Sequence, residues 1–168
     1  GEDRRVPGVG EERVLRTAPR SEMPGAFAPV VRRRRSEQLF REGKLPKRIC
    51  HCDTKVDNIL FDQDDSVLCV IDLDTAMPSF VFSDYGDFLR SAANTMPEDS
   101  PEYDKIQFRM DIFKAFTEGY LKTAGAFLTS IEIENLPYGA TLFPYMQTVR
   151  FFTDYLNGDT YFKIQYPE

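Results

Sequence analysis

The sequence predicts an α+β fold in which a small β-hairpin unit is followed by helices. Residues 49–52 and 58–61 are predicted to form short extended strands and 67–71 a continuous apolar strand, with turn-forming residues before the last of them. After Pro78 the apolar residues recur at helical spacing. A chain of 168 residues with 42% hydrophobic residues can bury a core, and its length suits one domain or one lobe of a larger enzyme.

Residues 1–35 differ in composition from the rest of the chain. They are rich in Gly, Pro and Arg, have few periodic apolar positions, and end in four consecutive arginines at 32–35. This composition predicts a poorly ordered basic arm or linker, with binding of an anionic partner by the arginines as the alternative. The folded domain is therefore expected to span residues 36–168.

The first elements of this domain are short. A turn or two of helix over 36–42 is expected to end at Gly43. The runs 58–61 and 67–71 flank the turn-forming residues 62–65, which predicts a β-hairpin. Because 67–71 is a continuous apolar run, we expect its strand to be buried.

Helices are predicted for the remainder of the chain. Ser83 or Asp84 can cap a helix that runs to about Ala93, and a second helix, whose Phe-rich face belongs to the core, is expected from 102 to 124. A third helical region is predicted further along the chain, and separate residue patterns mark its start and its end.

That third helical region opens at a capping box formed by Thr129 and Glu132. Pro137 and Pro144 are expected to break or kink it. Its end is predicted at the pair 157–158, Asn-Gly.

Charge and cysteine content exclude several classes of protein. Residues 1–48 hold 13 basic and 7 acidic side chains, whereas residues 49–168 hold 8 and 20, a balance that argues against a nucleic-acid polymer as partner. No run of apolar residues predicts a membrane span or signal peptide, so a soluble, cytoplasmic protein is expected. Cys50, Cys52 and Cys69 are expected to be buried, reduced thiols, since no second Cys/His pair completes a zinc site.

The segment from His51 to Asn58, together with Asp72, carries the chemistry. Phosphoryl transfer from a nucleotide requires a carboxylate that orients and deprotonates the acceptor hydroxyl, and oxygen ligands that hold Mg²⁺ on the phosphates. Asp53 suits the first role. Asn58 and Asp72 suit the second, because the hairpin returns Asp72 to the vicinity of Asn58, and Lys55 can neutralise charge on the transferred group.

The pattern H-x-D-x-K-x-x-N coincides with the catalytic loop of protein kinases, but neither D-F-G nor A-P-E follows. Instead, the chain resembles the aminoglycoside phosphotransferase and choline kinase superfamily, and within it the N-acetylhexosamine 1-kinase-like group. Four blocks carry the resemblance over about residues 45–166: HCDTKVDNILFD, VIDLDTAMP, SDYGDFLR and RFFTDYLNGDTYFK. The resemblance implies the C-terminal lobe of a protein-kinase-like fold, mostly helical, with a hairpin that carries the catalytic loop.

The resemblance also implies site residues and cofactors. It assigns Asp53 as the base and Asn58 and Asp72 as Mg²⁺ ligands, with ATP as the phosphoryl donor. Arg150 and Tyr161 are implied to lie near the sugar. One supporting role is implied as well, for Asp87 near the start of the following helix.

Several of these residues have simpler alternatives. His51 is expected to orient the loop rather than act as base, and Asp74 contacts a second metal or substrate or only caps its loop. Both Asp84 and Asp87 could satisfy the free N–H groups of a helix start.

The two residues assigned to the sugar have alternatives of the same kind. Arg150 could pair with Asp154, four residues later on the same helix. Tyr161 could be an ordinary core aromatic.

The expected function is ATP- and Mg²⁺-dependent phosphorylation of a small-molecule hydroxyl, a sugar at its anomeric position, as part of carbohydrate metabolism. Two alternatives stay open: a non-catalytic fragment or scaffold derived from such a kinase, and a kinase for an aminoglycoside or choline-like acceptor. The family's N-terminal lobe is not recognisable upstream of Ser36, so the chain is expected to be a C-terminal lobe, and one that ends early at Glu168.

Overall fold

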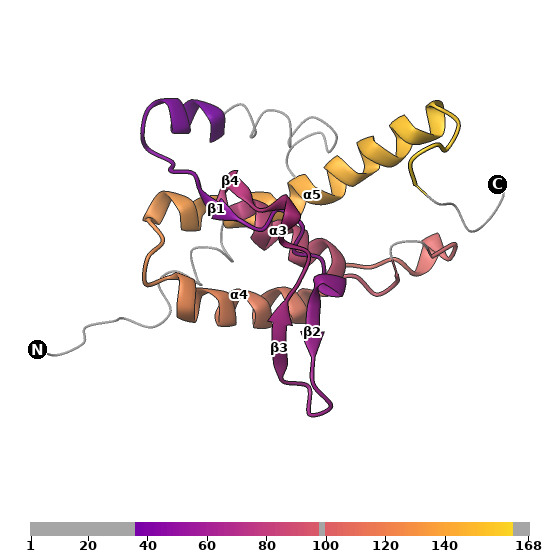
Figure 1. The fold of residues 1–168 in the computed structure, drawn as a ribbon, viewed down its shortest axis with the longest axis horizontal. Coiled ribbons are helices and arrows are strands. Elements are labelled where there is room, and N and C mark those ends of the chain that lie inside the picture. The colour runs from indigo at the N-terminus through magenta and orange to yellow at the C-terminus, as the bar shows by residue number, and fades with distance from the viewer. Residues whose placement is uncertain (1–35, 98–99, 163–168) are drawn as a thin grey trace, which may run out of the picture.

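The computed structural model describes residues 36–97 and 100–162, and the predicted arm over 1–35 lies outside them. The described chain combines helices with two small antiparallel sheets, which confirms the α+β class (Figure 1). After a short helix over 36–41, the elements in chain order are β1 (Arg48–Cys50), the 3₁₀ turn η1 (Val56–Asn58), β2 (Ile59–Phe61), β3 (Val67–Val70), η2 (Leu73–Thr75), β4 (Met77–Ser79), α3 (Val81–Ala92), η3 (Tyr103–Lys105), α4 (Met110–Ala124) and α5 (Ser130–Leu156).

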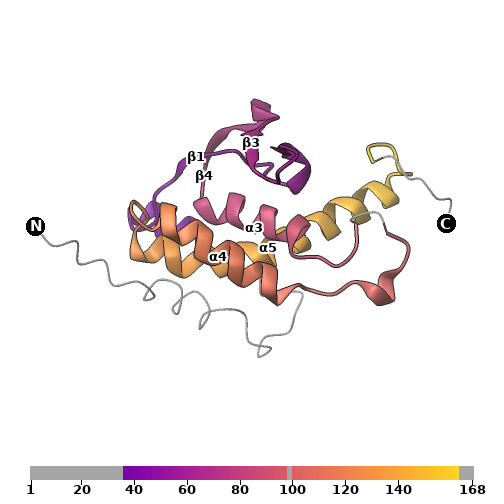
Figure 2. The same cartoon turned by 90° about the horizontal axis from the view of Figure 1, so that it is seen from below.

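In the sequence, the two strands of one sheet flank the two strands of the other. Strands β1 and β4 pair antiparallel with Arg48 opposite Ser79, and between them β2 and β3 form the predicted hairpin with Ile59 opposite Val70. The candidate catalytic segment therefore lies between β1 and β2, inside the stretch that the outer pair closes. Figure 2 shows the strands on one side of α3 and the longer helices on the other.

The core forms where α3 packs against α5. The two helices cross at Gly86 and Gly139, and a Cβ atom built on Gly86 would lie 2.2 Å from the backbone carbon of Gly139. From the other side, the Tyr85 ring contacts Phe116 in a tilted arrangement and Tyr120 edge to face, both on α4. The buried apolar side chains are Leu45, Phe80, Val81, Phe82, Tyr85, Leu89, Ala93, Phe113, Ala124, Leu128, Leu136, Tyr138, Leu142 and Phe143.

Two predicted helix starts were wrong. Helix α3 begins at Val81, so Ser83 and Asp84 lie inside it and do not cap it. Helix α4 begins at Met110 and not at residue 102. Before it, the chain forms η3 and then an extended stretch, where the hydroxyl of Thr95 donates to the carbonyl of Lys105 and accepts the N–H of Gln107.

Helix α5 matches its predicted ends but not its predicted interruptions. The capping box is present: the Thr129 side chain accepts from the N–H of Glu132, and the Glu132 carboxylate accepts from the N–H of Thr129. The helix continues through Pro137 and Pro144, because its buried side chains pack against α3 over this stretch. It ends before Gly158, whose φ of 84° is the left-handed conformation that favours glycine.

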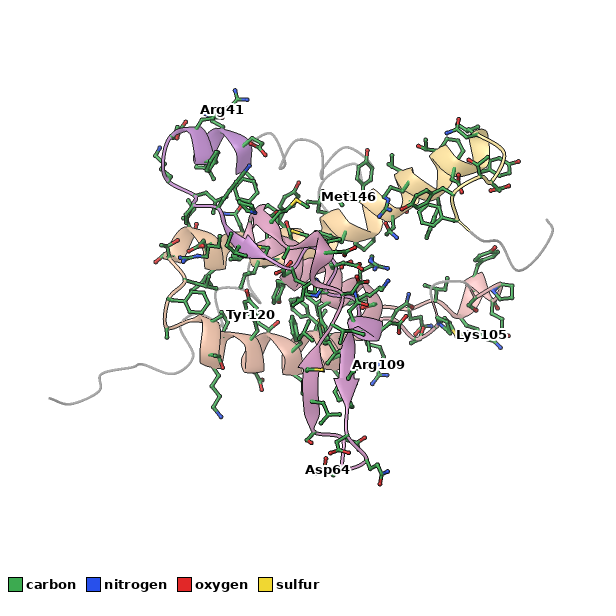
Figure 3. The ribbon with its side chains drawn as sticks, in the orientation of Figure 1. Arg41, Asp64, Lys105, Arg109, Tyr120 and Met146 are labelled. Atoms are coloured by element: carbon green, nitrogen blue, oxygen red, sulfur yellow. The ribbon has the colours of Figure 1, made fainter. Side chains whose placement is uncertain are left out.

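The expectation of a buried strand at 67–71 was wrong. All four residues of β3 are exposed, and Val67 retains 62% of its accessible surface. The hairpin extends away from the helices, with Asp64 at its tip (Figure 3). A two-stranded ribbon has two open faces, so apolar composition alone does not bury it.

The thiols are less buried than expected. Cys50 is buried, Cys52 is half-buried and Cys69 is exposed, and all three are free. The prediction of buried thiols therefore holds for Cys50 alone. Among the described residues, no helix is both long and apolar enough to cross a bilayer.

Candidate active site

The segment that follows β1 is held by the side chain of Asp84 on α3. Its carboxylate oxygens accept the backbone N–H groups of His51 and Cys52, each at 2.8 Å. Cys52 has a φ of 66°, a left-handed conformation that turns two successive N–H groups towards one carboxylate. Asp84 lies in the first turn of α3, as the helix-start interpretation predicts, but its carboxylate binds the N–H groups of the loop and not those of the helix.

Helix α3 holds the same segment at two further points. The Thr54 hydroxyl donates to the backbone carbonyl of Asp84 at 2.6 Å, and the hydroxyl of Ser91 accepts the N–H of Val56 at 3.0 Å. Asp84 and Ser91 are seven residues apart, so they share a helix face. The loop therefore lies along α3, which fixes both of its ends.

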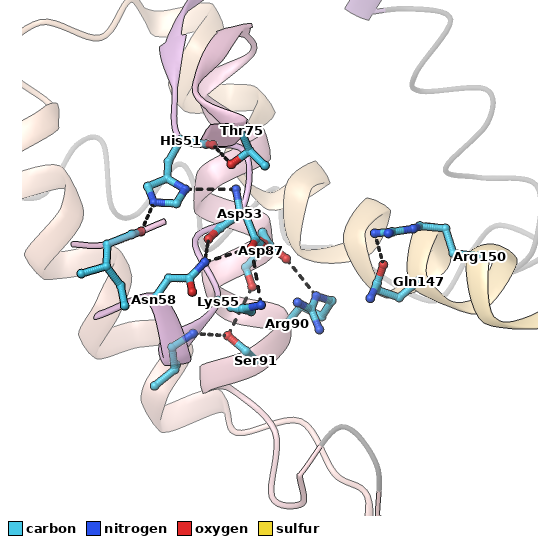
Figure 4. Close-up of polar contacts among 12 residues, drawn as sticks. His51, Asp53, Lys55, Asn58, Thr75, Asp87, Arg90, Ser91, Gln147 and Arg150 are labelled. Atoms are coloured by element: carbon cyan, nitrogen blue, oxygen red, sulfur yellow. Dashed lines mark hydrogen bonds and ion pairs between the residues drawn. The ribbon is translucent and has the colours of Figure 1, made fainter. Parts of the chain in front are cut away.

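Asp53, Lys55 and Asn58 come together in this loop (Figure 4). The Asn58 side-chain N–H₂ donates to the backbone carbonyl of Asp53 at 2.8 Å and to its Oδ2 at 2.9 Å, and Lys55 Nζ lies 3.5 Å from the same Oδ2. Asn58 is buried, whereas the Asp53 side chain keeps 30% of its exposure. The carboxylate is thus oriented by its neighbours and still accessible to another molecule.

His51 links the two halves of the predicted constellation. Its Nδ1 accepts the N–H of Asp53 at 3.3 Å, so the other nitrogen, Nε2, carries the proton and donates to the carbonyl of Ile71 at 2.8 Å. A second bond, from the Thr75 hydroxyl to the His51 carbonyl at 2.7 Å, fixes the same residue. These contacts agree with a supporting role, because both ring nitrogens are engaged by the backbone.

Asp72 lies next to Asn58 along the hairpin. The N–H of Ile71 donates to the carbonyl of Asn58 at 2.9 Å, which places residue 72 immediately beyond the paired strands. Asp72 itself is exposed and left-handed, with a φ of 64°. A carboxylate such as that of Asp72 and an amide oxygen such as that of Asn58 are the hard donors that Mg²⁺ prefers, so the residues present suit this ion, and their assignment as its ligands stays a prediction.

Residues 8–125 match the phosphotransferase enzyme family. The chain belongs to this family. The match covers more than half of the chain and includes the loop from His51 to Asn58, the hairpin, Asp72 and α3. Membership implies transfer of a phosphoryl group to a small molecule, the reaction class for which the catalytic segment was singled out.

Two further acidic residues that the sequence singled out, Asp74 and Asp87, differ in their surroundings. Asp74 is exposed in the first turn of η2. Asp87 is buried in the middle of α3, where its Oδ1 accepts from Arg90 Nε at 2.9 Å. The helix-start interpretation of Asp87 was therefore wrong, and its supporting role stays a prediction.

Arg150 on α5 lies apart from the Asp53 group (Figure 4). Arg150 on α5 donates to Gln147 Oε1 at 2.9 Å, and its guanidinium lies 5.4 Å from the centroid of the Phe162 ring. Asp154 accepts the N–H groups of Tyr161 and Phe162 and does not pair with Arg150, so that alternative was wrong. The Tyr161 side chain is 74% exposed, which excludes the core alternative.

An ion pair that the sequence does not predict joins β1 to α5. Arg48 donates through Nε and Nη2 to the two carboxylate oxygens of Glu132, at 2.5 and 2.9 Å. Burial of Glu132 raises the pKa of its carboxyl, but hydrogen bonds from Arg48 and Thr129 outweigh this and lower the pKa overall. The capping box identified Glu132 but could not identify a partner 84 residues away.

Asp84 and Ser91 are the other residues that the sequence analysis did not assign to the site. Their seven-residue separation within a predicted helix is a weak signal for a shared face. Their partners, His51 and Val56, lie more than 30 residues earlier in the chain. Only the packing of the loop on α3 reveals these contacts.

Proposed function

We propose that this protein is a small-molecule kinase that transfers the γ-phosphoryl group of ATP to a hydroxyl, with an N-acetylhexosamine-like sugar phosphorylated at its anomeric position as the acceptor. The observation that carries the proposal is the Asp53 carboxylate, which Asn58 orients at 2.9 Å and which keeps 30% of its exposure. Membership of the phosphotransferase enzyme family supports the reaction class.

Asp53 acts on the acceptor hydroxyl. Its carboxylate orients the hydroxyl and takes the proton while the hydroxyl oxygen forms a bond to the γ-phosphorus. The bond from that phosphorus to the β-phosphate oxygen breaks, and ADP leaves. Lys55, 3.5 Å from Asp53 Oδ2, offsets part of the negative charge that gathers at this point.

Asn58 and Asp72 are the residues that would hold Mg²⁺. When bound, the ion neutralises phosphate charge and keeps the phosphates in one geometry. The Asn58 N–H₂ group is committed to Asp53, which directs its amide oxygen elsewhere as a ligand. The His51 ring bonds to the carbonyl of Ile71, the residue before Asp72, and to the N–H of Asp53. It therefore fixes the position of the proposed metal ligand Asp72 relative to the proposed base Asp53.

The choice of a sugar rests on the segment at the end of α5. Its sequence, RFFTDYLNGDTYFK, is one of the blocks that resemble N-acetylhexosamine 1-kinases. Arg150 supplies donors and Tyr161 supplies a ring with a polar tip, which suit the hydroxyl groups and apolar face of a sugar. Asp154 fixes the backbone at Tyr161, so the exposed ring is presented from an ordered turn.

The experiment is a phosphoryl-transfer assay on the full chain with radiolabelled ATP, MgCl₂ and a panel of acceptors: N-acetylglucosamine, N-acetylgalactosamine, kanamycin and choline. We expect transfer to the N-acetylhexosamines and a loss of at least about a hundredfold in Asp53→Asn, as for removal of a general base. The matched control is Asp57→Asn, a neighbouring exposed carboxylate, which should retain full activity.

The same panel discriminates the alternatives. Transfer to kanamycin or choline, with none to the hexosamines, would replace the acceptor but keep the reaction. If no acceptor is phosphorylated and Mg²⁺·ATP does not shift the melting temperature, the kinase proposal is wrong for this chain and a scaffold role takes its place.

A further inference from the structure

The hydroxyl of Ser91 bonds to backbone groups of its own helix and of the loop, and its longest contact is the one with the Asp87 carbonyl at 3.5 Å. It donates to the carbonyl of Phe88, one turn back on α3, at 3.0 Å, and it accepts the N–H of Val56 at 3.0 Å. A serine hydroxyl has a single hydrogen to donate, so donation into its own helix leaves its lone pairs for Val56. The direction of this contact is therefore fixed by α3.

Val56 begins the 3₁₀ turn η1, and the turn has no cap of its own. The N–H groups at the start of a helical turn lack partners within the turn, and the residue before it, Lys55, makes no side-chain cap bond. The Ser91 hydroxyl fills this position from another helix. It acts as an N-cap supplied across a tertiary contact.

The last residue of the same turn is Asn58. We propose that Ser91 is a positioning residue which caps η1 and thereby fixes the amide of Asn58 for the cation and for Asp53; this inference rests on the proposed kinase function. Asn58 closes the turn through its N–H to the carbonyl of Lys55 at 3.0 Å, and its side chain makes both bonds to Asp53. Fraying at Val56 would move the buried Asn58 with it.

Ser91 acts separately from Asp84. Asp84 binds the N–H groups of His51 and Cys52 at the start of the loop, whereas Ser91 binds at its end. Loss of the Ser91 hydroxyl should therefore leave the start of the loop in place and disturb the turn that carries Asn58. The expected consequence is a greater requirement for Mg²⁺, with a smaller change in kcat.

The experiment compares the full chain with Ser91→Ala, Ser91→Thr and the control Ser83→Ala. Ser83 lies on the same helix, and its hydroxyl contacts Ser79 and not the loop. Amide hydrogen exchange by NMR reports on Val56, and the side-chain amide resonances of Asn58 report on its contacts. Phosphoryl transfer at saturating ATP gives the half-saturating MgCl₂ concentration.

In Ser91→Ala we expect faster exchange at Val56, a shifted Asn58 side-chain resonance and a rise of about tenfold in half-saturating MgCl₂, the effect of one ordinary hydrogen bond. Ser91→Thr keeps the hydroxyl and should behave as the wild type, as should Ser83→Ala. Unchanged exchange at Val56, or an equal rise in MgCl₂ requirement in Ser83→Ala, would overturn the inference.

Failure of the kinase function is distinguishable from failure of this inference. If the wild-type chain transfers no phosphoryl group, the proposed function fails, while the Val56 and Asn58 resonances still decide the role of Ser91. An undisturbed Asn58 side-chain resonance in Ser91→Ala then overturns the proposed role of Ser91. A change confined to Ser91→Ala supports Ser91 as the residue that fixes the turn.

Discussion

Helix α3 and the β2–β3 hairpin both border the candidate active site, but they differ in how they are held. Only part of α3 is apolar, yet Val81, Phe82, Tyr85 and Leu89 are buried. Every residue of β3 is apolar or a cysteine, yet all four are exposed. Burial in this protein therefore follows the elements that pack together, and not the apolar content of a segment.

The difference also shows where the catalytic loop obtains its shape. The loop bonds to α3 through Asp84 and Ser91, at its start and at its end. Its bonds towards the hairpin side are the His51 contact with the Ile71 carbonyl and the strand pairing that follows Asn58. Helix α3 therefore fixes the shape of the loop, and the hairpin brings Asp72 back towards the site.

The largest expected effect comes from separating α3 from α5. The Cβ atom of Gly86→Ala would lie 2.2 Å from the backbone carbonyl carbon of Gly139, so the two helices must move apart. We expect the unfolding free energy to fall by about 3 kcal/mol or more. The control is Gly119→Ala on α4, where nothing lies within 4 Å and a gain of about 0.5–1 kcal/mol is expected. Urea unfolding of both variants measures this, and equal stabilities would contradict the close crossing.

A somewhat smaller effect is expected when the loop is released from α3. Asp84→Asn replaces one acceptor oxygen by an N–H₂ group that faces a backbone N–H, so one N–H of His51 or Cys52 loses its partner. We expect the unfolding free energy to fall by about 3 kcal/mol and the transfer activity to be lost. An exposed carboxylate, Asp104→Asn, is the control, and the expectation fails if the two variants melt together.

A third effect depends on pH. The lowered pKa of Glu132 means that its ionised form stabilises the fold above the ordinary pKa of a glutamate, about 4.3, and that this contribution is lost as pH falls through the lower, folded-state value. We expect Glu132→Gln to be less stable than the wild type by about 2 kcal/mol at pH 7. Denaturant unfolding from pH 7 to pH 3 should show the two curves converging below about pH 4. A constant difference over this range would exclude the charged pair as the cause.

The hairpin should tolerate a change that α3 does not. Val67→Thr in exposed β3 is expected to alter unfolding free energy by less than about 0.5 kcal/mol. The same change at buried Val81 should cost about 1–2 kcal/mol, because it buries a hydroxyl. Thermal unfolding of the pair tests this, and an equal loss in both would mean that another surface covers the hairpin.

The smallest perturbation is chemical labelling of the thiols, which leaves the fold intact. Cys69 on the hairpin is exposed, whereas burial raises the pKa of the Cys50 thiol to about 12. We expect a disulfide reagent such as DTNB to label Cys69 in the folded protein and Cys50 only on unfolding, as mass spectrometry of the peptides can follow. Labelling of both at one rate would remove the distinction between the two regions.

The features that the sequence predicted well are local ones. Asp53, Lys55 and Asn58 lie within six positions of each other, so a turn is enough to bring them together. The hairpin has its turn residues between its strands, and the capping box of Thr129 and Glu132 spans a single helical turn. Short-range patterns of this kind bring the residues close together, whereas the contacts of the loop with α3 fix its final shape.

The features that the sequence did not predict depend on distant segments. The start of α4 was misplaced because the chain before it bonds to Thr95 and pairs with Asn94, 13 or 14 residues earlier than Phe108, and so does not join the helix. Nothing near Asp84 in sequence indicates that its carboxylate binds His51 and Cys52. The exposure of β3 likewise follows from the absence of a described helix on its faces, and not from its own residues.

The pairing of β1 with β4 has a consequence for engineering this protein. Arg48 lies opposite Ser79, so the segment between them starts and ends at neighbouring positions. The turn at residues 62–65 is the exposed tip of this segment. Added residues at this tip lengthen the ribbon without moving the points where it is anchored. The tip therefore offers a site for inserting a tag or a reporter domain within a few residues of the strands that lead to the catalytic loop.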